Sequence, residues 1–485
     1  MAKQGGFPLV AGLTLIATLG GLLFGYDTAV ISGAIGAIDA NFIDPLNLPE
    51  TQRLSLSGFT IASALFGCIV GGAVAGWVAD RFGRRVGLIV AAVFFLVGTL
   101  GSAVPELGLG PIGGMGPDAL TPFNIYRIIG GIGVGLASLL SPLYIAEIAP
   151  KEVRGKLVSL NQIAIVVGMV GVYFVNWAIA QLGDEQWLRT VGWRWMFASE
   201  AVPSLLFLGL LLFVPDTPRW LVMKGRTQEA LGVLRRLDTE ADSPAILAEI
   251  EQSLVVRGDR LFAFGALVIV VGIMLSVFQQ LIGINAVLYY APLMFKNMGA
   301  TTDSALLQTV IVGIANVGFT VVAMYTVDRF GRRPLMILGA AIMAVAMLVL
   351  GCLFAGNALG LGALLAMILY IAGFALSWGP VTWVLLSEIF PNSIKGKAMA
   401  IAVAAQWIAN LVVSWSFKVL DGNSYLNAQF NHGFAYWLYA AMSVLAGLFV
   451  WRYVPETKGC SLEEIQRLWF GKRAAAADAL NPAKV

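Results

Sequence analysis

Three ionisable residues lie inside long apolar stretches of this 485-residue chain: Asp27, Arg127 and Glu200. An ionised side chain is costly in a hydrocarbon environment, so residues of this kind are candidates for handling ions or protons. Poor solvation favours the protonated form of a carboxyl group, whereas a neighbouring guanidinium group favours the carboxylate. An aspartate subject to both influences is suited to reversible protonation.

Helix geometry indicates that Asp27 and Arg127 can meet. Asp27 lies about 28 Å along an apolar stretch that begins near Pro8. Arg127 lies about one and a half turns after Pro122, in a stretch that runs in the opposite direction. Two interpretations stay open: a pair coupled to proton movement, or a permanent ion pair that only holds two helices together. Glu200 either belongs to the proton path or positions Arg127, or its carboxyl group is hydrogen-bonded to a neighbouring helix.

Neutral amides and aromatic residues are concentrated in the apolar stretches of the second half. The segments are FQQLIGINAVLYYAP (278–292), SWGPVTW (377–383) and AAQWIAN (404–410). Amide side chains supply hydrogen-bond donors and acceptors without a fixed charge, which fits a neutral polyol. Trp383 can offer an apolar face and one N–H donor to a sugar. Ordinary packing remains an alternative for Trp383 and Trp407.

Glycine and proline in these segments predict bends near the middle of a membrane. Gly283 and Pro292 bracket a weakened part of the seventh apolar stretch, and Gly379 and Pro380 are expected to break the tenth. Discontinuous helices are where transporters bind substrates and open gates.

Several classes of chemistry lack their residues. His432 is the only histidine, and Cys68, Cys352 and Cys460 have no CxxC spacing. A zinc site, a Ser-His-Asp triad and a phosphate-binding lysine loop therefore lack their parts. The segment GGIGVG at 130–135 indicates close helix packing rather than a dinucleotide loop, because no strand precedes it. We expect no enzyme activity, no cofactor and no metal.

The composition requires a membrane around these residues. Apolar residues make up 58% of the chain and charged residues 12%, which leaves too little polar surface for a soluble shell. Twelve apolar runs are long enough to cross a bilayer. Their centres lie near residues 20, 67, 94, 132, 168, 202, 275, 315, 344, 373, 406 and 442. The sequence predicts an all-α membrane protein with 12 transmembrane helices.

Two kinds of loop motif occur twice. DRFGRR stands at 80–85 and 328–333, and AEIAPKEVRGKL at 146–157 is repeated as SEIFPNSIKGKA at 387–398. Repeats about half a chain apart indicate two copies of a six-helix unit with the same orientation. The predicted organisation is an N-terminal six-helix bundle (1–214), cytoplasmic linker helices (215–260), a C-terminal six-helix bundle (261–454) and a cytoplasmic tail (455–485).

Basic residues predict the orientation. If both termini are on one side, 25 of the 31 Lys and Arg residues lie there, one (Arg127) lies inside a span and five lie opposite. The five are Arg53, Arg189, Arg194, Lys296 and Lys418. The positive-inside rule then places both termini in the cytoplasm.

The quoted segments, together with GGLLFGYDTAVISG, RIIGGIGVG, PDTPRWL, GPVTWVLLSEIFP and VPETKG, resemble the sugar porters of the major facilitator superfamily over nearly the whole chain. Within that family the chain looks most like bacterial proton-coupled xylose symporters. The resemblance implies a fold of two six-helix bundles with short cytoplasmic helices between them. It also implies that Asp27 carries the proton.

The resemblance implies further site residues. The sugar would be held by Gln162, Gln279, Gln280, Asn285, Gly379, Trp383, Gln406 and Trp407, with Phe24 and Tyr289 closing the site. An ionic latch between the bundles on the inner side would use Arg84, Glu147, Arg154, Arg332 and Glu388. The positive-inside bias alone is the alternative for the latch residues.

Two departures from the family pattern bear on detail. Lys395 stands where the family usually has arginine, which removes a bidentate partner for Glu388. Met169 stands where the similar xylose symporters have glutamine, which leaves the preferred sugar open.

From all of this we expect a proton-coupled symporter of a pentose or hexose such as D-xylose, working by alternating access in a bacterial inner membrane. Its partners are expected to be the sugar, the proton and the lipid bilayer, with no nucleic acid, and it is expected to act as a monomer. A facilitative uniporter and a sugar sensor are the alternatives.

Overall fold

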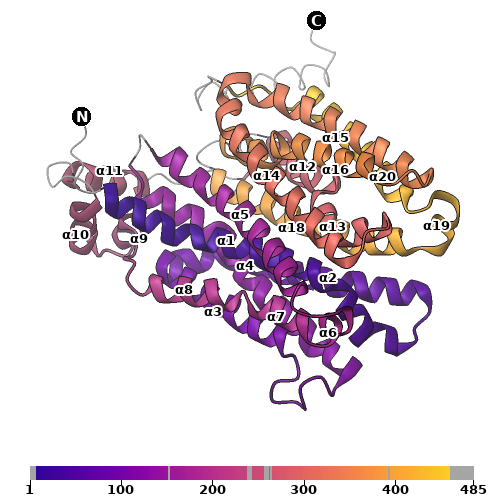
Figure 1. Ribbon diagram of the computed structural model, residues 1–485. Helices are drawn as coiled ribbons and strands as arrows, with labels where there is room; N and C mark the ends of the chain where they lie inside the picture. Colours follow the sequence, from indigo (N-terminus) through magenta and orange to yellow (C-terminus); the bar gives the residue numbers. More distant parts are fainter. Residues whose placement is uncertain are drawn as a thin grey trace, which may run out of the picture. The chain divides into compact units, whose positions relative to one another are not determined.

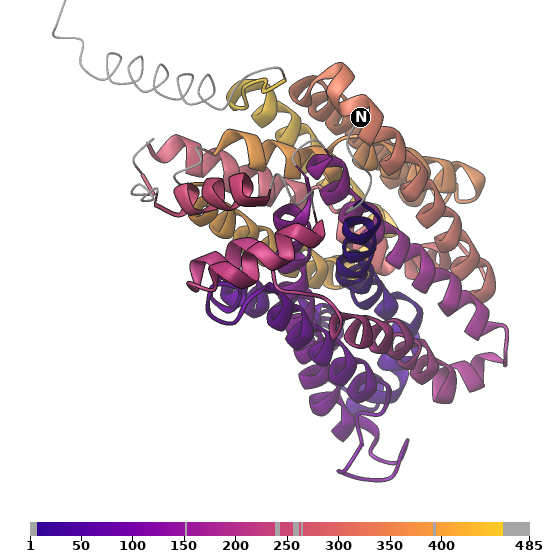
Figure 2. The same ribbon diagram turned by 90° about the vertical axis from the view of Figure 1, so that its left-hand side faces the viewer.

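A computed structural model describes residues 7–150, 153–237, 243–255, 261–262, 265–390 and 394–458. Helices and their connections make up this part of the chain, and no strand occurs in it (Figures 1 and 2). Twelve helical segments are long and apolar enough to cross a membrane. Each of the twelve predicted centres falls inside one of these segments. The protein is therefore a multi-pass membrane protein, as predicted.

The first six spans are built from long helices and short irregular turns. The long helices are α1 (Phe7–Ile38), α2 (Glu50–Phe82), α3 (Arg84–Ala103), α4 (Leu120–Ile148), α5 (Arg154–Ala180) and α8 (Ala201–Leu211). The shorter elements are η1 (Asp39–Ile43), η2 (Asp44–Leu46), η3 (Gly116–Ala119), α6 (Glu185–Trp187), η4 (Leu188–Gly192) and α7 (Trp193–Ala198). The sixth span is interrupted at Ser199 and Glu200, between α7 and α8.

Three helices connect the sixth and seventh spans. They are α9 (Pro218–Met223), α10 (Thr227–Leu237) and α11 (Ser243–Val255), and they lie side by side (Figure 1). The buried residues Trp220, Leu221 and Ala230 pack together, with Leu247 of α11 against them. The amphipathic segments of the linker were predicted to form short helices, and α10 and α11 confirm this.

The last six spans contain two discontinuous helices. The elements are α12 (Ala266–Leu281), α13 (Ile284–Asn297), α14 (Thr302–Phe330), α15 (Arg332–Ala355), α16 (Leu361–Ala375), α17 (Trp378–Ile389), α18 (Lys395–Gly422) and α20 (Gly433–Tyr453). A short helix, α19 (Ser424–Phe430), precedes α20. The predicted tail from 455 on lies outside the described residues beyond residue 458, as does Cys460.

Contacts group the chain into two compact units. The first comprises residues 1–255, 285–317 and 414–432, and the second comprises 256–284, 318–413 and 433–485. The outer parts of α13, α14 and α18 thus pack within the first unit. The predicted division into bundles at residues 214 and 261 remains a prediction.

Glycine residues allow the helices around Asp27 to approach closely. A Cβ atom on Gly25 of α1 would lie 1.8 Å from the carbonyl oxygen of Ile165 in α5. On α4, a Cβ atom on Gly131 would lie 1.8 Å from the carbonyl oxygen of Ala64. A side chain fits at neither position, which supports the interpretation of GGIGVG as a packing segment.

The predicted bends are found in part. The seventh span breaks at Gly283, whose φ of 90° suits glycine, and α13 then continues through Pro292. The tenth span breaks at Leu376 and Ser377, before Gly379 and Pro380. Pro380 lies in the first turn of α17, where a helix has no need of the missing N–H group. The expectations for Pro292 and for Gly379 and Pro380 as breakpoints were therefore wrong in position.

Candidate functional site

The first part of the site is a buried ion pair between α1 and α4. Nη1 of Arg127 donates to Oδ1 of Asp27 at 2.8 Å, and Nη2 donates to the main-chain oxygen of Asp27 at 3.1 Å. Both side chains are 2% exposed. The predicted meeting of these two residues is confirmed. Arg127 also lies over the ring of Phe197, at 5.5 Å from its centroid.

Glu200 adds a second carboxyl group to this pair. It lies at the interruption between α7 and α8, is 0% exposed and interacts with both Asp27 and Arg127. Within the described part of the chain, neither carboxyl oxygen of Glu200 has a hydrogen-bond partner, nor does Oδ2 of Asp27. One guanidinium group balances one carboxylate, so charge balance favours a proton on one of the two acids. The cluster can therefore hold and release a proton.

Glycine residues create the space for the Asp27 carboxyl group. A Cβ atom on Gly130 of α4 would lie 3.3 Å from Oδ1 of Asp27. A Cβ atom on Gly98 of α3 would lie 2.5 Å from the Cα atom of Gly130. The close contact of α3 and α4 thus depends on glycine beside the acid.

The second part of the site is an amide cluster within the second unit. Gln279 donates to the carbonyl oxygens of Trp378 at 3.0 Å and Gly379 at 3.4 Å. Gln280 and Gln406 both donate to Oε1 of Gln279, at 3.3 Å and 2.5 Å. Gln279 and Gln280 are buried, and Gln406 is half-buried. The break in the tenth span exposes main-chain carbonyl groups to these amides, which explains why the cluster forms there.

Other predicted sugar-binding residues are distributed over the two units. Trp383, half-buried, and Trp407, buried, belong to the second unit with the amide cluster. Four residues lie in the first unit: Phe24 on α1, Gln162 on α5, and Asn285 and Tyr289 on α13. Tyr289 neighbours Tyr173, whose hydroxyl donates to the main-chain oxygen of Leu288 at 2.7 Å.

The inner loop motif of the first unit forms a closed network. Nη2 of Arg84 donates to Oε1 of Glu147 at 2.9 Å, and the Thr217 hydroxyl donates to Oε2 at 2.5 Å. The main-chain N–H of Arg85 donates to Asp216 at 3.2 Å. Burial raises the pKa of Asp216, although hydrogen bonding and nearby arginines oppose this rise.

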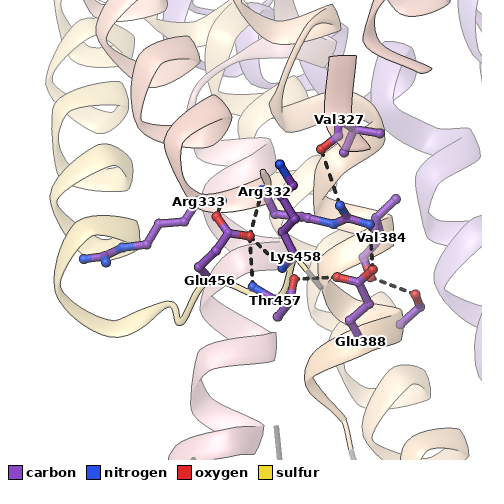
Figure 3. Close-up of polar contacts among 9 residues, drawn as sticks. Val327, Arg332, Arg333, Val384, Glu388, Glu456, Thr457 and Lys458 are labelled. Atoms are coloured by element: carbon purple, nitrogen blue, oxygen red, sulfur yellow. Dashed lines mark hydrogen bonds and ion pairs between the residues drawn. The ribbon is translucent and has the colours of Figure 1, made fainter. Parts of the chain in front are cut away.

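The second unit repeats this network (Figure 3). Nη2 of Arg332 donates to Oε1 of Glu388 at 3.0 Å, and the hydroxyl of Thr457 donates to Oε2 at 2.5 Å. Glu456 accepts hydrogen bonds from the main-chain N–H groups of Arg332, Arg333, Thr457 and Lys458 (Figure 3). Burial raises the pKa of Glu456, but these N–H donors outweigh it and hold the pKa below its usual value.

The glycine of DRFGRR has the same role in both copies. Gly83 has φ 97° and Gly331 has φ 90°, a conformation that other residues rarely adopt. A Cβ atom would lie 2.6 Å from Asp216 at the first position and 2.8 Å from Glu456 at the second. The acid therefore reaches the start of the next helix only over a glycine.

Each predicted latch residue pairs inside its own unit as far as the described hydrogen bonds go. Arg84 pairs with Glu147, and Arg332 pairs with Glu388. Arg154 donates to the main-chain oxygen of Ala149 at 3.3 Å. A latch between the bundles stays a prediction.

Sequence reasoning missed the threonine and acid that complete the two networks. The signal was present, because Pro215-Asp216-Thr217 is repeated as Pro455-Glu456-Thr457, 240 residues later. It also missed the ion pair at the outer side of the first unit, where Nζ of Lys418 lies 2.9 Å from Asp39. Sequence spacing gives no signal for that pair, since 379 residues separate its members.

Known proteins share this fold and these motifs. The family model "Sugar (and other) transporter" matches residues 13–469. The D-xylose-proton symporter of Escherichia coli (strain K12) is 57% identical over 472 residues, which cover 95% of this chain and 96% of that protein. The glucose facilitated diffusion protein of Zymomonas mobilis is 48% identical over 477 residues, covering 98% of this chain and 100% of that protein.

Solved structures agree with the sequence comparison. An inward open conformation of the xylose transporter from E. coli matches with a TM-score of 0.86 and 54% identity, covering 95% of this chain and 100% of that chain. A proton:xylose symporter of the major facilitator superfamily bound to 6-bromo-6-deoxy-D-glucose matches with a TM-score of 0.82 and 55% identity, covering 96% and 100%. These relatives are transporters and not enzymes. The chain belongs to the sugar transporter family of the major facilitator superfamily.

Proposed function

We propose that this protein is a proton-coupled symporter that brings a monosaccharide, D-xylose or a related pentose or hexose, into a bacterial cell by alternating access. The single observation that carries the proposal is the fully buried cluster of Asp27, Arg127 and Glu200. The 57% identity to a D-xylose-proton symporter supports it. Met169 stands on α5 two turns beyond Gln162, which leaves open whether xylose is the preferred sugar.

Proton binding at Asp27 acts through Arg127. The arginine is bonded to the carboxylate at 2.8 Å and to the main-chain oxygen of the same residue at 3.1 Å. A proton on Asp27 cancels the ionic part of this contact and leaves the hydrogen bond to the main chain. The attraction between α1 and α4 weakens, and the helices that bear the sugar ligands can change position. The membrane potential then contributes about 2.3 kcal/mol per charge for each 100 mV, which permits uphill uptake.

Neutral hydrogen-bonding groups hold the sugar. Gln279, Gln280 and Gln406 supply amide donors and acceptors, and Trp383 supplies an apolar face for sugar C–H groups. Gly379 contributes its main-chain oxygen. Gln162, Asn285 and Trp407 complete the set, and Phe24 and Tyr289 close the site.

Further proposals concern topology and assembly. Both termini lie in the cytoplasm of a bacterium, the protein acts as a monomer in the inner membrane, and the two bundles comprise residues 1–214 and 261–454. The positive-inside bias supports the orientation. Arg84, Glu147, Arg154, Arg332 and Glu388 form the inner gate.

The test uses purified protein in sealed proteoliposomes. Uptake of labelled xylose and of labelled glucose is measured with and without an imposed proton gradient. The symporter accumulates its sugar above the external concentration only with the gradient, and addition of sugar moves protons inward. A passive carrier, for which the 48% identical glucose facilitated diffusion protein is a precedent, equilibrates sugar at the same rate in both conditions.

A further inference from the structure

Most buried hydroxyl groups in the spans of the first unit are satisfied by their own helix. Ser63 donates to the oxygen of Thr60 at 2.7 Å, and Ser138 donates to that of Gly135 at 2.8 Å. Thr28 donates to the oxygen of Phe24 at 2.8 Å. This bonding to the preceding turn is the usual behaviour of serine and threonine inside helices.

Three hydroxyl groups near Glu200 depart from this pattern. Ser204 on α8 and Ser141 on α4 are 0% exposed, and Thr99 on α3 is 1% exposed. Across the ranges that the structure describes, their oxygen atoms have no hydrogen-bond partner. A buried polar group without a partner is costly, and bound water is the common means by which proteins satisfy such groups.

The unpartnered groups continue from Glu200 along α8. The main-chain N–H of Ser204 donates to the oxygen of Glu200 at 3.1 Å, so the two residues are one helical turn apart. Side chains four residues apart lie on one face with Cβ atoms about 5–6 Å apart, a span that one water molecule bridges. Thr99 neighbours the Glu200 carboxyl group at the other side.

Ser141 extends this series past Gly20 of α1. A Cβ atom on Gly20 would lie 2.2 Å from Oγ of Ser141 and 3.3 Å from the ring of Phe207. Phe207 follows Ser204 by three residues on the buried face of α8. The Ser141 hydroxyl is therefore about one turn further from Glu200 than Ser204 is.

The series ends where the sixth span ends. Tyr144 follows Ser141 by one turn on α4, and its hydroxyl donates at 3.0 Å to the oxygen of Pro215. Pro215 lies in the loop after α8, at the end of the span that we assign to the cytoplasmic side. Successive polar groups thus connect the buried cluster with the inner surface.

We propose that Thr99, Ser204 and Ser141 hold a file of buried water molecules through which the proton passes from Glu200 to the cytoplasm, apart from the sugar-binding residues. The inference rests on the proposed symport and adds the route of proton release. Asp27 gives its proton to the Glu200 carboxylate, and Glu200 gives it to the water at Ser204. Only O–H bonds break and form, and Glu200 is again a carboxylate when the proton leaves past Tyr144. The serines act as positioning residues for the water.

The kinetic test combines Ser141→Ala and Ser204→Ala. Proton-driven sugar accumulation and the internal acidification reported by a trapped pH-sensitive dye should both slow by about fivefold to tenfold, the effect of losing a buried hydrogen-bond partner. Exchange of labelled for unlabelled sugar at equal concentrations needs no net proton release and should keep its native rate. Ser63→Ala, which removes an equally buried hydroxyl that bonds to its own helix, should leave both rates unchanged.

The outcomes separate this route from the symport itself. If the native protein moves protons with sugar and the double variant does so at the native rate, the water file is refuted and the symport stands. If the native protein moves no protons with sugar, the symport fails first.

A second measurement uses only the native protein. Hydroxyl-radical labelling with mass spectrometry modifies side chains that touch bound water. Phe207, 0% exposed beside Ser141, should be labelled more than Phe42, which is 2% exposed and packed between Phe123 and Trp193. Equal and minimal labelling of the two rings would overturn the proposal even if the double variant failed to fold.

Discussion

At the scale of residues, Arg127 contacts Asp27 in two ways that respond differently to a proton. The bond to the carboxylate depends on charge, whereas the bond to the main-chain oxygen does not. Protonation therefore weakens the contact without releasing the arginine. This explains how one proton can change the packing of α1 and α4 while the buried guanidinium keeps a partner.

Replacement of the acid tests this role. In the variant Asp27→Asn, the Arg127 contact resembles that to a protonated aspartate, so sugar still crosses but no proton is coupled. Accumulation against a gradient should fall to a ratio of about one, while exchange of labelled for unlabelled sugar continues. Uptake in proteoliposomes measures both. Undiminished accumulation in this variant would show that Asp27 only pairs two helices.

The amide cluster allows a second prediction. Gln280→Ala removes a donor and an acceptor beside Gln279 and should weaken sugar binding by about tenfold or more, as expected for one buried hydrogen bond. Isothermal calorimetry in detergent measures the affinity. Gln308→Ala, which removes a half-buried amide bonded to Ser304 on α14, is the control and should bind normally. Equal affinity in both variants would remove Gln280 from the site.

Residue types alone predicted much of this site but not its neighbours. Asp27, Arg127 and Glu200 could be predicted because charge is rare in apolar segments. Ser141, Ser204 and Thr99 could not, since serine and threonine are common in membrane helices and usually bond to the preceding turn. Only the tertiary contacts tell which hydroxyl groups lack a partner.

At the scale of elements, the periodicity of the chain predicted the spans but placed some breaks wrongly. Gly283 was identified because a positive φ favours glycine. The interruption at Glu200 has no glycine or proline at the break, and the sequence gave no reason to expect it. The break at Ser377 lies before Gly379 and Pro380 because proline is tolerated in the first turn of a helix.

An element at the outer side makes stability depend on pH. Nδ1 of His432 lies 3.0 Å from Asp421 of α18, which also accepts hydrogen bonds from Asn297 of α13. The hydrogen bond to Asp421 raises the pKa of His432, although burial opposes the rise. The contribution to stability is therefore complete below the unfolded pKa of about 6.5 and is lost as pH rises through the folded value.

Thermal unfolding in detergent measures this dependence. The stability difference between the native protein and His432→Gln should be largest near pH 6 and should shrink as pH rises above the folded pKa of the histidine. Asn427 approaches the main chain of the same loop and is unchanged by the substitution, so it offers a control for loop integrity. Parallel unfolding curves across this pH range would contradict the assignment.

At the scale of the whole molecule, outer ends of helices from both halves of the sequence pack within the first unit. Lys418 pairs with Asp39, whose Oδ1 accepts a hydrogen bond from Ser57 at 2.5 Å. Trp415 donates to the main-chain oxygen of Ser55 at 2.9 Å. Contacts of this kind close the outer side, in line with the similarity to an inward open transporter structure.

Breaking the outer ion pair should favour opening of that side. In Lys418→Ala, a cysteine introduced at position 55 should react about fivefold faster with a membrane-impermeant maleimide, the factor for about 1 kcal/mol. Arg53→Ala, which breaks a solvent-exposed pair with Asp44, should have little effect. An unchanged rate in Lys418→Ala would show that this pair does not hold the outer side closed.

The duplicated acid and threonine network bears on how such a chain can be made. Every hydrogen bond of the first copy closes among Arg84, Arg85, Glu147, Asp216 and Thr217, and every one of the second closes beyond residue 331. A cut in the linker near residue 258 would sever none of them. Two polypeptides produced from separate genes could each form their own inner network and then join, which is how a half-sized ancestor could have worked as a pair before its gene was fused.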